Sequence, residues 1–361
     1  MRTAAVIGTG LIGTSVALAL TRRGVAVYLS DQDESAARTA ASLGAGRVGD
    51  PPGQADLAVI AVPPPYIAAT LEQAQSRGLA TTYTDVASVK AGPQHDAIAH
   101  GVDQATYIGG HPLAGREVSG PLGGRADLFD GRPWVLTPTA ATGRDALNRA
   151  LELISLCGAV PVVMDAAEHD HAVALVSHTP HLVSAIMAAR LEHATENAVR
   201  IAGPGVRDVT RIAAGDPRLW EEILTANASA VADVLDEYAA DLVKAVGSLR
   251  AVAAGDADKR SAGLAELVEL LKRGNVGQAR IPGKHGAPRA VYSSLTVVIS
   301  DAPNELARLF AAVGAAGVNI EDVSIEHSPG QAVGLVALQV APESAGPLAE
   351  RLTERGWTVQ S

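Results

Sequence analysis

Three glycines near the start of the chain constrain its fold more than any other feature of the sequence. Gly8, Gly10 and Gly13 lie between a short apolar run, residues 3–7, and a longer apolar stretch, residues 11–23. A glycine-rich turn that joins a buried strand to a helix is typical of the first βα unit of an open α/β sheet. The sequence therefore predicts an α/β fold, a doubly wound parallel sheet with helices on both faces.

The same turn is a candidate binding site for a dinucleotide. Gly8 permits the tight turn, Gly10 lets a pyrophosphate approach the backbone, and Gly13 allows the helix to pack closely on the strand. Asp31 ends the next apolar run and is expected to accept hydrogen bonds from the adenosine ribose. Its charge repels a 2′-phosphate, which favours NAD over NADP, whereas glycines that serve turn geometry alone are the alternative. The residues expected at the coenzyme are Gly8, Gly10, Leu11, Ile12, Gly13 and Asp31.

Strand and helix patterns extend this Rossmann-type region to residue 164. Short apolar runs predict further strands at 55–62, 81–85, 106–109 and 133–137, with helical patterns between them. From residue 165 to residue 280 the periodicity is helical, as in residues 219–249. We expect residues 1–164 to form the NAD-binding domain. We expect residues 165–280 to form an all-helical domain whose long helices pair in a homodimer.

The last part of the chain is organised differently. Residues 274–290 are rich in Gly and Pro and lack periodicity, so we expect a loop there, with a linker at 281–290. Residues 291–361 follow the order strand, helix, strand, strand, helix, strand. This βαββαβ order predicts a small ferredoxin-like module.

Composition restricts the partners and the location of the protein. The chain has 361 residues, of which 47% are hydrophobic, and its formal net charge of −10 disfavours nucleic acid and anionic membranes as partners. Cys157 is its single cysteine, so no internal disulfide forms and nothing indicates secretion. The first strand follows Met1 without room for a signal peptide, and no apolar run approaches the roughly 20 residues of a membrane span. We expect a cytoplasmic protein that binds a small molecule.

A histidine in a rigid frame is the first candidate catalytic residue. His111 lies in the segment Gly109–Gly115, after a predicted strand and therefore at the carboxyl edge of the sheet. An imidazole with a reference pKa of about 6.5 suits proton transfer at neutral pH. Beside NAD, such a base indicates oxidation of a carbon that bears a hydroxyl. Ser88, in another loop at this edge, is expected to contact a substrate hydroxyl or the nicotinamide amide, or to cap the next helix.

The helical region adds histidines and arginines. His178 and His181 are spaced to share one helix face. Together with residues 168–171 (Glu-His-Asp-His) they form either a metal site or a histidine pair packed between helices; hydride transfer with NAD needs no metal, and we expect none. Arg207 and Arg211 either grip a carboxylate by parallel hydrogen bonds or form a solvated helix start.

Together these motifs resemble the prephenate/arogenate dehydrogenase family of tyrosine biosynthesis. The resemblance runs through residues 1–280 and rests on the segments Gly8–Gly13, Asp85–Lys90, Gly110–Gly115, Ser177–His181 and Asp208–Arg211. The C-terminal module resembles an ACT domain, through residues 301–303 and 317–322. The resemblance implies an NAD-dependent dehydrogenase with an anionic small-molecule substrate, a helical dimerisation domain and feedback by tyrosine at the ACT-like module.

The resemblance also implies a reaction and roles for the site residues. Prephenate loses hydride from its hydroxyl-bearing carbon to NAD and loses its ring carboxylate as carbon dioxide, which gives 4-hydroxyphenylpyruvate. By this resemblance His111 accepts the hydroxyl proton, Ser88 steadies the hydroxyl, and Arg211 binds a substrate carboxylate. His181, together with His178 and Asp170, would shape the pocket from the helical domain. Trp220 would either pack there across the dimer or be a core tryptophan.

Two residues depart from the family pattern. Arg116 stands after the histidine motif in place of a smaller residue, where it adds a cation near the substrate or pairs with Glu117. Asn304 stands where ACT domains commonly have glycine, and Asn still tolerates a left-handed backbone.

Three alternative functions remain open at this stage. An arogenate dehydrogenase would make tyrosine directly, because its substrate differs from prephenate only by an amino group in place of the side-chain keto group. A β-hydroxyacid dehydrogenase would use a lysine in a Gly-rich helix, and Lys244 is not in such a setting. In an amino-acid sensor without enzyme activity, His111, Ser88 and Arg211 would have no role.

Overall fold

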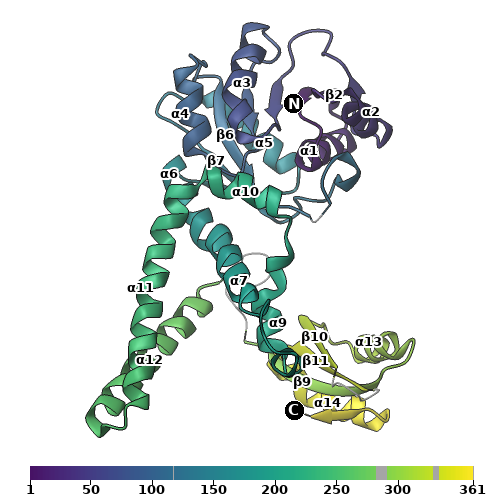
Figure 1. The fold of residues 1–361 in the computed structure, drawn as a ribbon. Helices are drawn as coiled ribbons and strands as arrows, with labels where there is room; N and C mark the ends of the chain where they lie inside the picture. Colours follow the sequence, from purple (N-terminus) through teal and green to yellow (C-terminus); the bar gives the residue numbers. More distant parts are fainter. Residues whose placement is uncertain (117, 282–290, 328–332, 361) are drawn as a thin grey trace. The chain divides into compact units, whose positions relative to one another are not determined.

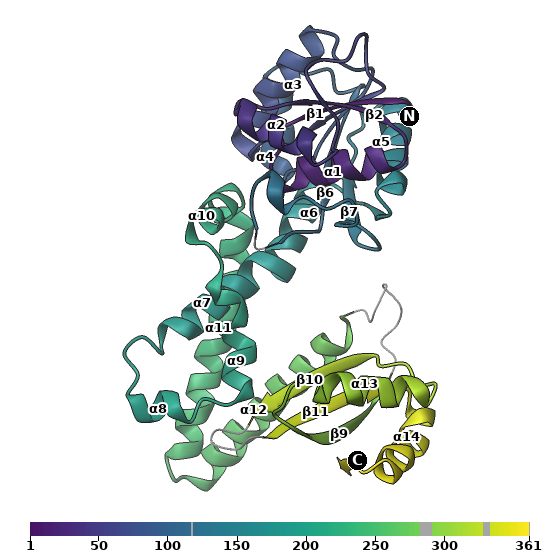
Figure 2. The same cartoon turned by 90° about the vertical axis from the view of Figure 1, so that its right-hand side faces the viewer.

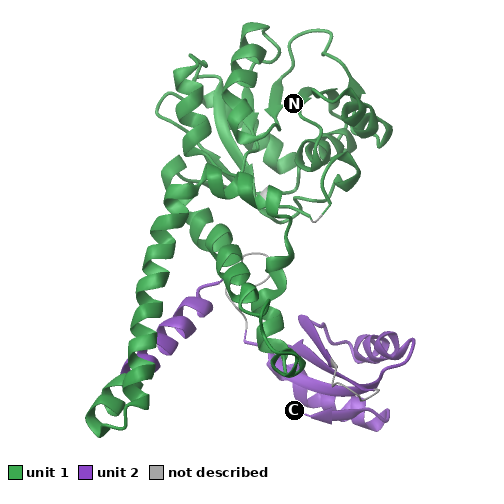
Figure 3. Ribbon diagram, viewed as in Figure 1, with its two compact units in different colours: residues 1–264 green, residues 265–361 purple. Residues whose placement is uncertain are grey.

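The structure is a computed structural model that describes residues 1–116, 118–281, 291–327 and 333–360. The chain divides into two compact units, residues 1–264 and residues 265–361 (Figure 3). Almost all of the linker predicted at 281–290 lies outside the described residues. The α/β region and most of the helical region belong to the first unit.

The α/β region is built on an eight-stranded sheet in the order β3-β2-β1-β4-β5-β6-β7-β8 (Figure 1). Its strands are β1 (Thr3–Ile7), β2 (Ala26–Ser30), β3 (Arg47–Val48), β4 (Leu57–Ile60), β5 (Tyr83–Asp85), β6 (Tyr107–Pro112), β7 (Pro133–Thr137) and β8 (Val160–Val163). Neighbouring strands pair in parallel, as predicted, except for the antiparallel pair of β6 and β7. The described residues of the long loop that joins those two strands contain no crossover helix, and such a connection lets the chain reverse.

Helices cover both faces of this sheet, as Figures 1 and 2 show. The helices on one face are α1 (Leu11–Arg22), α2 (Glu34–Ser42) and α5 (Arg144–Leu156); those on the other are α3 (Ile67–Ser76) and α4 (Ala91–Ala99). Val6 packs with the first set and its neighbour Ala5 with the second, because successive strand residues point to opposite faces. The strand order reverses direction between β1 and β4, and ligands of such sheets bind at the carboxyl edge of that point.

The second region is helical. Its elements are α6 (Ala166–Val173), the π-helical turn η3 (Ala174–His178), α7 (Thr179–Ala189), α8 (Glu196–Arg200), α9 (Pro204–Thr210), the 3₁₀ turn η4 (Arg211–Ala214), α10 (Pro217–Ala226), α11 (Ala228–Ala253) and α12 (Ala257–Ala279). Asn227 interrupts the helical pattern predicted across residues 219–249. The sequence predicted a loop from residue 274. That prediction is wrong for residues 274–279, because α12 continues to Ala279. Gly274 and Gly277 lie inside that helix, since a helical glycine costs only about 1 kcal/mol relative to alanine.

One helical stretch in the described chain, residues 166–189, is long and apolar enough by length and composition to cross a membrane. Residues 168–171 (Glu-His-Asp-His) are polar, so the stretch is not an uninterrupted apolar run. His169 and Asp170 are buried within it and hydrogen-bond to the α/β region. These contacts place the start of the stretch inside the protein, against α4 and β7.

The C-terminal module confirms the predicted βαββαβ order. Its elements are β9 (Ser293–Ser300), α13 (Glu305–Ala315), β10 (Asp322–His327), β11 (Val333–Val340), α14 (Pro342–Glu354) and β12 (Thr358–Gln360). The strands form an antiparallel sheet in the order β10-β11-β9-β12, and both helices pack on one core with it. Asn304, before α13, has a φ of 72°, so it adopts the left-handed backbone that the sequence allowed for.

Candidate active site

The glycine-rich turn lies at the point where the strand order reverses, between β1 and β4. Gly8 has a φ of 97°, and a Cβ there would collide with the carbonyl oxygen of Ala61, just after β4. A Cβ on Gly13 would collide with the carbonyl oxygen of Gly8. A Cβ on Gly10, by contrast, would meet no described protein atom within 4 Å. Gly10 therefore leaves open space beside the backbone, as a bound pyrophosphate requires.

The start of α1 suits an anionic group. Gly10 precedes the helix, and its first amides have no side-chain cap among the described residues. Free amides and the positive end of the helix dipole attract phosphate. Leu11 and Ile12 are half-buried, and their backbone amides belong to this first turn.

Asp31 follows β2 and is tied to the same turn. Its carboxylate accepts hydrogen bonds from the backbone N–H and the hydroxyl of Thr9, at 2.5 and 2.8 Å, and from the N–H of Asp33 at 3.0 Å. A carboxylate offers about four acceptor positions. One position remains for a ribose hydroxyl, while a 2′-phosphate would meet negative charge. These residues fit NAD.

His111 is the last residue but one of β6, and a chain of polar groups reaches it from the helical region. Its Nδ1 lies 2.8 Å from Nε2 of His169 in α6. Nδ1 of His169 lies 2.8 Å from a carboxylate oxygen of Asp170. Asp170 also accepts hydrogen bonds from the N–H groups of Lys90 and Ala91, at 2.8 and 2.9 Å, where α4 begins. Two imidazoles and a carboxylate thus form one connected chain.

The hydrogen bonds between Asp170, His169 and His111 determine which nitrogen of each imidazole carries the proton. Burial acts to raise the pKa of Asp170, but hydrogen bonds from His169, Ala91 and Lys90 hold that pKa below its usual value. The ionised carboxylate therefore accepts the proton of His169 Nδ1, and Nε2 of His169 in turn accepts the proton of His111 Nδ1. It follows that Nε2 of His111 carries no proton and is free to accept one.

His111 is also kept uncharged. Burial lowers its pKa well below the ordinary value of 6.5, and the neighbouring His169, Lys90 and His178 lower it further. Although protein atoms surround the ring, the residue remains only half-buried, so part of it is accessible. A neutral imidazole that a small molecule can reach is what proton abstraction needs.

His178 is the last residue of the π-helical turn η3, and Asn227, between α10 and α11, holds its ring. The Asn227 side-chain amide donates to the backbone carbonyl of Asp170 at 2.8 Å and to Nδ1 of His178 at 3.1 Å. Burial lowers the pKa of His178, so the ring is neutral and carries its proton on Nε2. Nε2 of His178 is therefore a hydrogen-bond donor.

His181 and Trp220 form a stacked pair within the same chain. Their ring centroids are 3.6 Å apart and their planes differ by 9°. Burial lowers the pKa of His181. A Cβ on Gly215, which follows η4, would lie 2.7 Å from Nε1 of Trp220 and 2.9 Å from Cε1 of His181. The end of η4 is thus packed against this pair.

The remaining predicted residues lie outside the imidazole chain. Ser88 is half-buried between β5 and α4, and its hydroxyl has no hydrogen-bond partner among the described residues. Arg211 begins η4, is exposed and makes no ion pair within the described ranges. Arg116 donates to the carbonyl of Gly123 at 2.8 Å and so ties the loop after His111 to the short turn η2 (Pro121–Gly123). Glu117, its other suggested partner, lies outside the described residues.

The suggested metal ligands do not converge. His169 and Asp170 are buried, whereas Glu168 and His171 are exposed on the opposite side of α6. Within the part of the chain that the structure describes, no three His, Cys, Asp or Glu residues are placed to hold a metal ion. His169 and Asp170 serve the imidazole chain instead.

Sequence reasoning gave no role to four residues that hold the site together. The Lys90 ammonium donates to the Asp85 carboxylate and, at 2.6 Å, to the carbonyl of Gly110, and the Tyr107 hydroxyl donates to Asp85 at 2.7 Å. Asn227 is the fourth. Lys90 lies two residues after Ser88 in the segment Asp85–Lys90, but nothing in that segment indicated burial of the ammonium.

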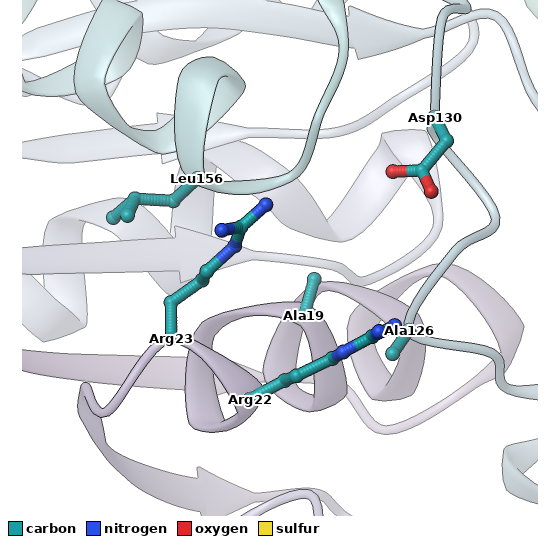
Figure 4. A pocket seen from close by; sticks show the side chains of 6 residues that line it. All are labelled: Ala19, Arg22, Arg23, Ala126, Asp130 and Leu156. Carbon is teal, nitrogen blue, oxygen red and sulfur yellow. The ribbon is translucent and has the colours of Figure 1, made fainter.

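A separate surface hollow lies at the far end of α1. Figure 4 shows Arg22, Arg23 and Asp130 around it. Since α1 starts at the carboxyl edge of the sheet and runs back along it, this hollow is at the amino edge. No predicted site residue lines it.

A coenzyme turn on a doubly wound sheet, with a neutral histidine held at the same edge by a helical region, defines an NAD-dependent dehydrogenase. Residues 16–163 match the family described as "Prephenate dehydrogenase, nucleotide-binding domain", and residues 165–273 match "Prephenate dehydrogenase, dimerization domain". The chain belongs to the prephenate dehydrogenase family. This match separates it from the β-hydroxyacid dehydrogenases and amino-acid sensors considered above.

Individual relatives agree with the family. A probable prephenate dehydrogenase from Streptomyces niveus, NovF, is 43% identical, and the match covers 100% of both chains. The crystal structure of Synechocystis arogenate dehydrogenase matches 77% of this chain and 99% of its own, with 28% identity and a TM-score of 0.65. A prephenate dehydrogenase from Aquifex aeolicus, solved with hydroxyphenyl propionate and NAD⁺, matches 77% of this chain and 97% of its own, with 25% identity and a TM-score of 0.66.

Proposed function

We propose that this protein catalyses the NAD-dependent oxidative decarboxylation of prephenate to 4-hydroxyphenylpyruvate, with His111 as the general base. The observation that carries the proposal is the hydrogen-bonded series Asp170–His169–His111, which leaves Nε2 of His111 to accept a proton. The Asp170–His169 chain holds it at the carboxyl edge of the sheet, on the edge where the coenzyme turn lies. The comparisons support the substrate and the coenzyme.

The proton follows a balanced path through His111. NAD, when bound, takes the hydride from the hydroxyl-bearing carbon of the substrate. Nε2 of His111 accepts the hydroxyl proton as the carbonyl forms, and the ionised Asp170, acting through His169, stabilises the resulting imidazolium. Loss of carbon dioxide leaves its electron pair in the ring, which becomes a phenolate. His111 returns the proton to that oxygen, so the base is regenerated.

Three further residues are proposed to hold the substrate. Ser88, in the loop after β5, has a hydroxyl without a hydrogen-bond partner among the described residues and would hydrogen-bond to the substrate hydroxyl. Arg211 has an exposed guanidinium that makes no ion pair in the described chain, so it is available to a side-chain carboxylate. His178 offers Nε2–H as a donor.

His181 completes the proposed pocket from α7. Its ring is fixed against Trp220, and the packing of Gly215 on both rings brings η4, which begins with Arg211, next to α7. We propose that this packing sets the distance between the histidines and Arg211.

We also propose a homodimer in the cytoplasm, formed through the helical region. Large apolar side chains are exposed on η3 and α11: Leu175, Val176, Tyr238, Leu242, Val243 and Leu249. An apolar surface on long helices indicates an interface. The match to a dimerization domain supports this arrangement.

The C-terminal module is proposed to be an ACT-like regulatory domain that binds tyrosine. Its βαββαβ order and the left-handed turn at Asn304 support the ACT-like assignment. Feedback by the end product is the effect that such a module would exert in tyrosine biosynthesis.

Steady-state rates with two substrates and two coenzymes test the function. We expect a higher kcat/KM for prephenate with NAD than for arogenate with NAD, and little turnover with NADP because of Asp31. The similarity to an arogenate dehydrogenase makes arogenate the necessary comparison. Turnover of arogenate alone would overturn the substrate assignment, and turnover of neither would overturn the proposed reaction.

A further inference from the structure

A buried ion pair lies beneath the proposed base and takes no part in the mechanism described so far. The side chains of Lys90 and Asp85 are 1% and 0% exposed, and the ammonium donates to the carboxylate. Burying two charges is costly, and apolar side chains of similar size commonly stabilise a fold as well or better. Stability alone therefore does not explain why a charged pair occupies this place.

Lys90 is connected to His111 by two separate routes. Its ammonium donates at 2.6 Å to the carbonyl of Gly110, which belongs to the peptide bond that leads into His111. Its backbone N–H donates at 2.8 Å to Asp170, which holds His169, and His169 holds Nδ1 of His111. One residue thus fixes both the backbone and the ring of the base.

Asp85, the acidic member of the ion pair, connects it to the loop that carries Ser88. Its Oδ1 accepts a hydrogen bond from the N–H of Ala87 at 2.8 Å, one residue before Ser88. Its Oδ2 accepts from the Tyr107 hydroxyl at 2.7 Å, on the strand that carries His111. The ion pair therefore joins the loop of Ser88 to the strand of His111.

The two glycines before His111 make this arrangement possible. A Cβ on Gly109 would lie 2.5 Å from Oγ1 of Thr137 and 3.5 Å from both Oδ2 of Asp85 and Cδ of Lys90. A Cβ on Gly110 would lie 2.8 Å from the carbonyl oxygen of Asp85. A side chain at Gly109 would collide with Thr137, and one at Gly110 would collide with the backbone of Asp85, so neither would fit while the ion pair lies against the strand.

We propose that the Lys90–Asp85 ion pair is a positioning unit that holds His111 and Ser88 in the relative positions that the reaction needs. The inference rests on the proposed role of His111 as base. The positive charge of Lys90 opposes a second positive charge nearby, and it lowers the pKa of His111, after burial and His169. The titratable groups around His111 are Lys90, Asp85, Tyr107, His169, Asp170 and His178.

Lys90→Met tests the proposal, because it removes the charged ammonium and keeps an unbranched side chain that is only one atom shorter. We expect kcat to fall by about tenfold to a hundredfold through misplacement of the base, with the affinity for NAD unchanged. The acid limb of kcat/KM against pH should move to higher pH, since His111 would be protonated more easily. A Lys90→Met protein with the wild-type kcat and the wild-type pH profile would overturn the proposal.

Tyr107→Phe and Tyr83→Phe form a matched pair, because the two tyrosines are register partners on β6 and β5. Tyr107→Phe removes only a hydrogen bond to Asp85, so the test stands even if Lys90→Met does not fold. Tyr83→Phe removes hydrogen bonds to the backbone of Ala80 and Ala74 and should lower Tm alone. We expect Tyr107→Phe, unlike Tyr83→Phe, to lower kcat while the KM for NAD stays unchanged. Equal kcat values for the two variants would show a merely structural role of Tyr107 and overturn the proposal.

The failure of the inference is distinguishable from failure of the proposed function. An active His111→Asn enzyme would remove the base itself. An inactive His111→Asn enzyme together with wild-type kinetics in Lys90→Met and Tyr107→Phe would refute the positioning unit alone.

Discussion

At the scale of single residues, the site depends on which nitrogen of His111 carries the proton. The tautomer is set from outside the α/β region, by His169 and Asp170 of α6. A side chain that fixes the tautomer of a catalytic imidazole can be worth up to about 10⁴ in rate, as in serine proteases. His169 is therefore as important to the account as the base it orients.

Replacement of His169 tests this dependence. We expect His169→Gln to lower kcat by about tenfold or more, because His111 Nδ1 loses the acceptor that fixes its tautomer. His171→Gln is the matched control, since His171 lies on the same helix but is exposed. Equal kcat values for the two variants, measured at saturating prephenate and NAD, would contradict the role of His169.

The substrate carboxylate gives a second prediction at this scale. We expect Arg211→Ala to raise KM for prephenate by about tenfold or more, because a bound carboxylate would lose its charged partner. Arg207→Ala, an exposed arginine of α9, is the comparison. A KM for prephenate that is the same in both variants would remove Arg211 from the site.

At the scale of elements, different glycines of the coenzyme turn serve coenzyme binding and helix packing. Gly10→Ala adds a methyl group to open space at a backbone conformation that alanine adopts, with φ of −67° and ψ of −164°. We expect an unchanged Tm and a clearly weaker affinity for NAD, measured by calorimetry. Gly13→Ala forces a Cβ into the carbonyl of Gly8 and should lower the free energy of unfolding by about 1–3 kcal/mol. Wild-type NAD binding by Gly10→Ala would contradict the assignment of this turn.

Much of the element pattern was predictable from local sequence. β1 and β7 were predicted with their observed bounds, since continuous apolar runs end there at clear turn residues. β3 and β8 were not predicted, because β3 has two residues and β8 is largely exposed. The antiparallel entry of β7 depends on the path of a long loop, which local patterns do not encode.

The site was predictable in its parts but not in its connections. The glycine turn and His111 carry local signals of turn geometry and chemistry. His169 and Asp170 showed only a ligand-like spacing, because their partners are the distant His111 and Lys90. Asn227 broke a helical pattern, yet its hydrogen bonds to Asp170 and His178 appear only in the folded chain.

At the scale of the whole molecule, three histidines link stability to pH. Burial lowers the pKa of His111, His178 and His181 below 6.5 in the folded protein. Below pH 6.5 the unfolded chain binds protons that the folded chain does not, so the free energy of unfolding should decrease as pH falls from 6.5 toward these lowered values. Each such histidine contributes up to about 1.4 kcal/mol per pH unit. Denaturant unfolding that gives the same stability at about pH 7 and pH 5.5 would contradict this prediction.

Regulation is a second property of the whole chain. We expect tyrosine at millimolar levels to inhibit the intact protein, and a chain that ends at residue 285 to escape that inhibition while keeping its activity. Rates with and without tyrosine for both chains provide the measurement. An intact protein that ignores tyrosine would show that the βαββαβ module has another ligand or none.

The most direct measurement of the central claim is the turnover of prephenate by His111→Asn, with the dissociation constant for NAD determined on the same sample. The account predicts that kcat falls by about 10²–10⁴ while NAD binds as in the wild type. Turnover within about tenfold of the wild-type rate would contradict it, because His111 would then not be the group that accepts the substrate proton.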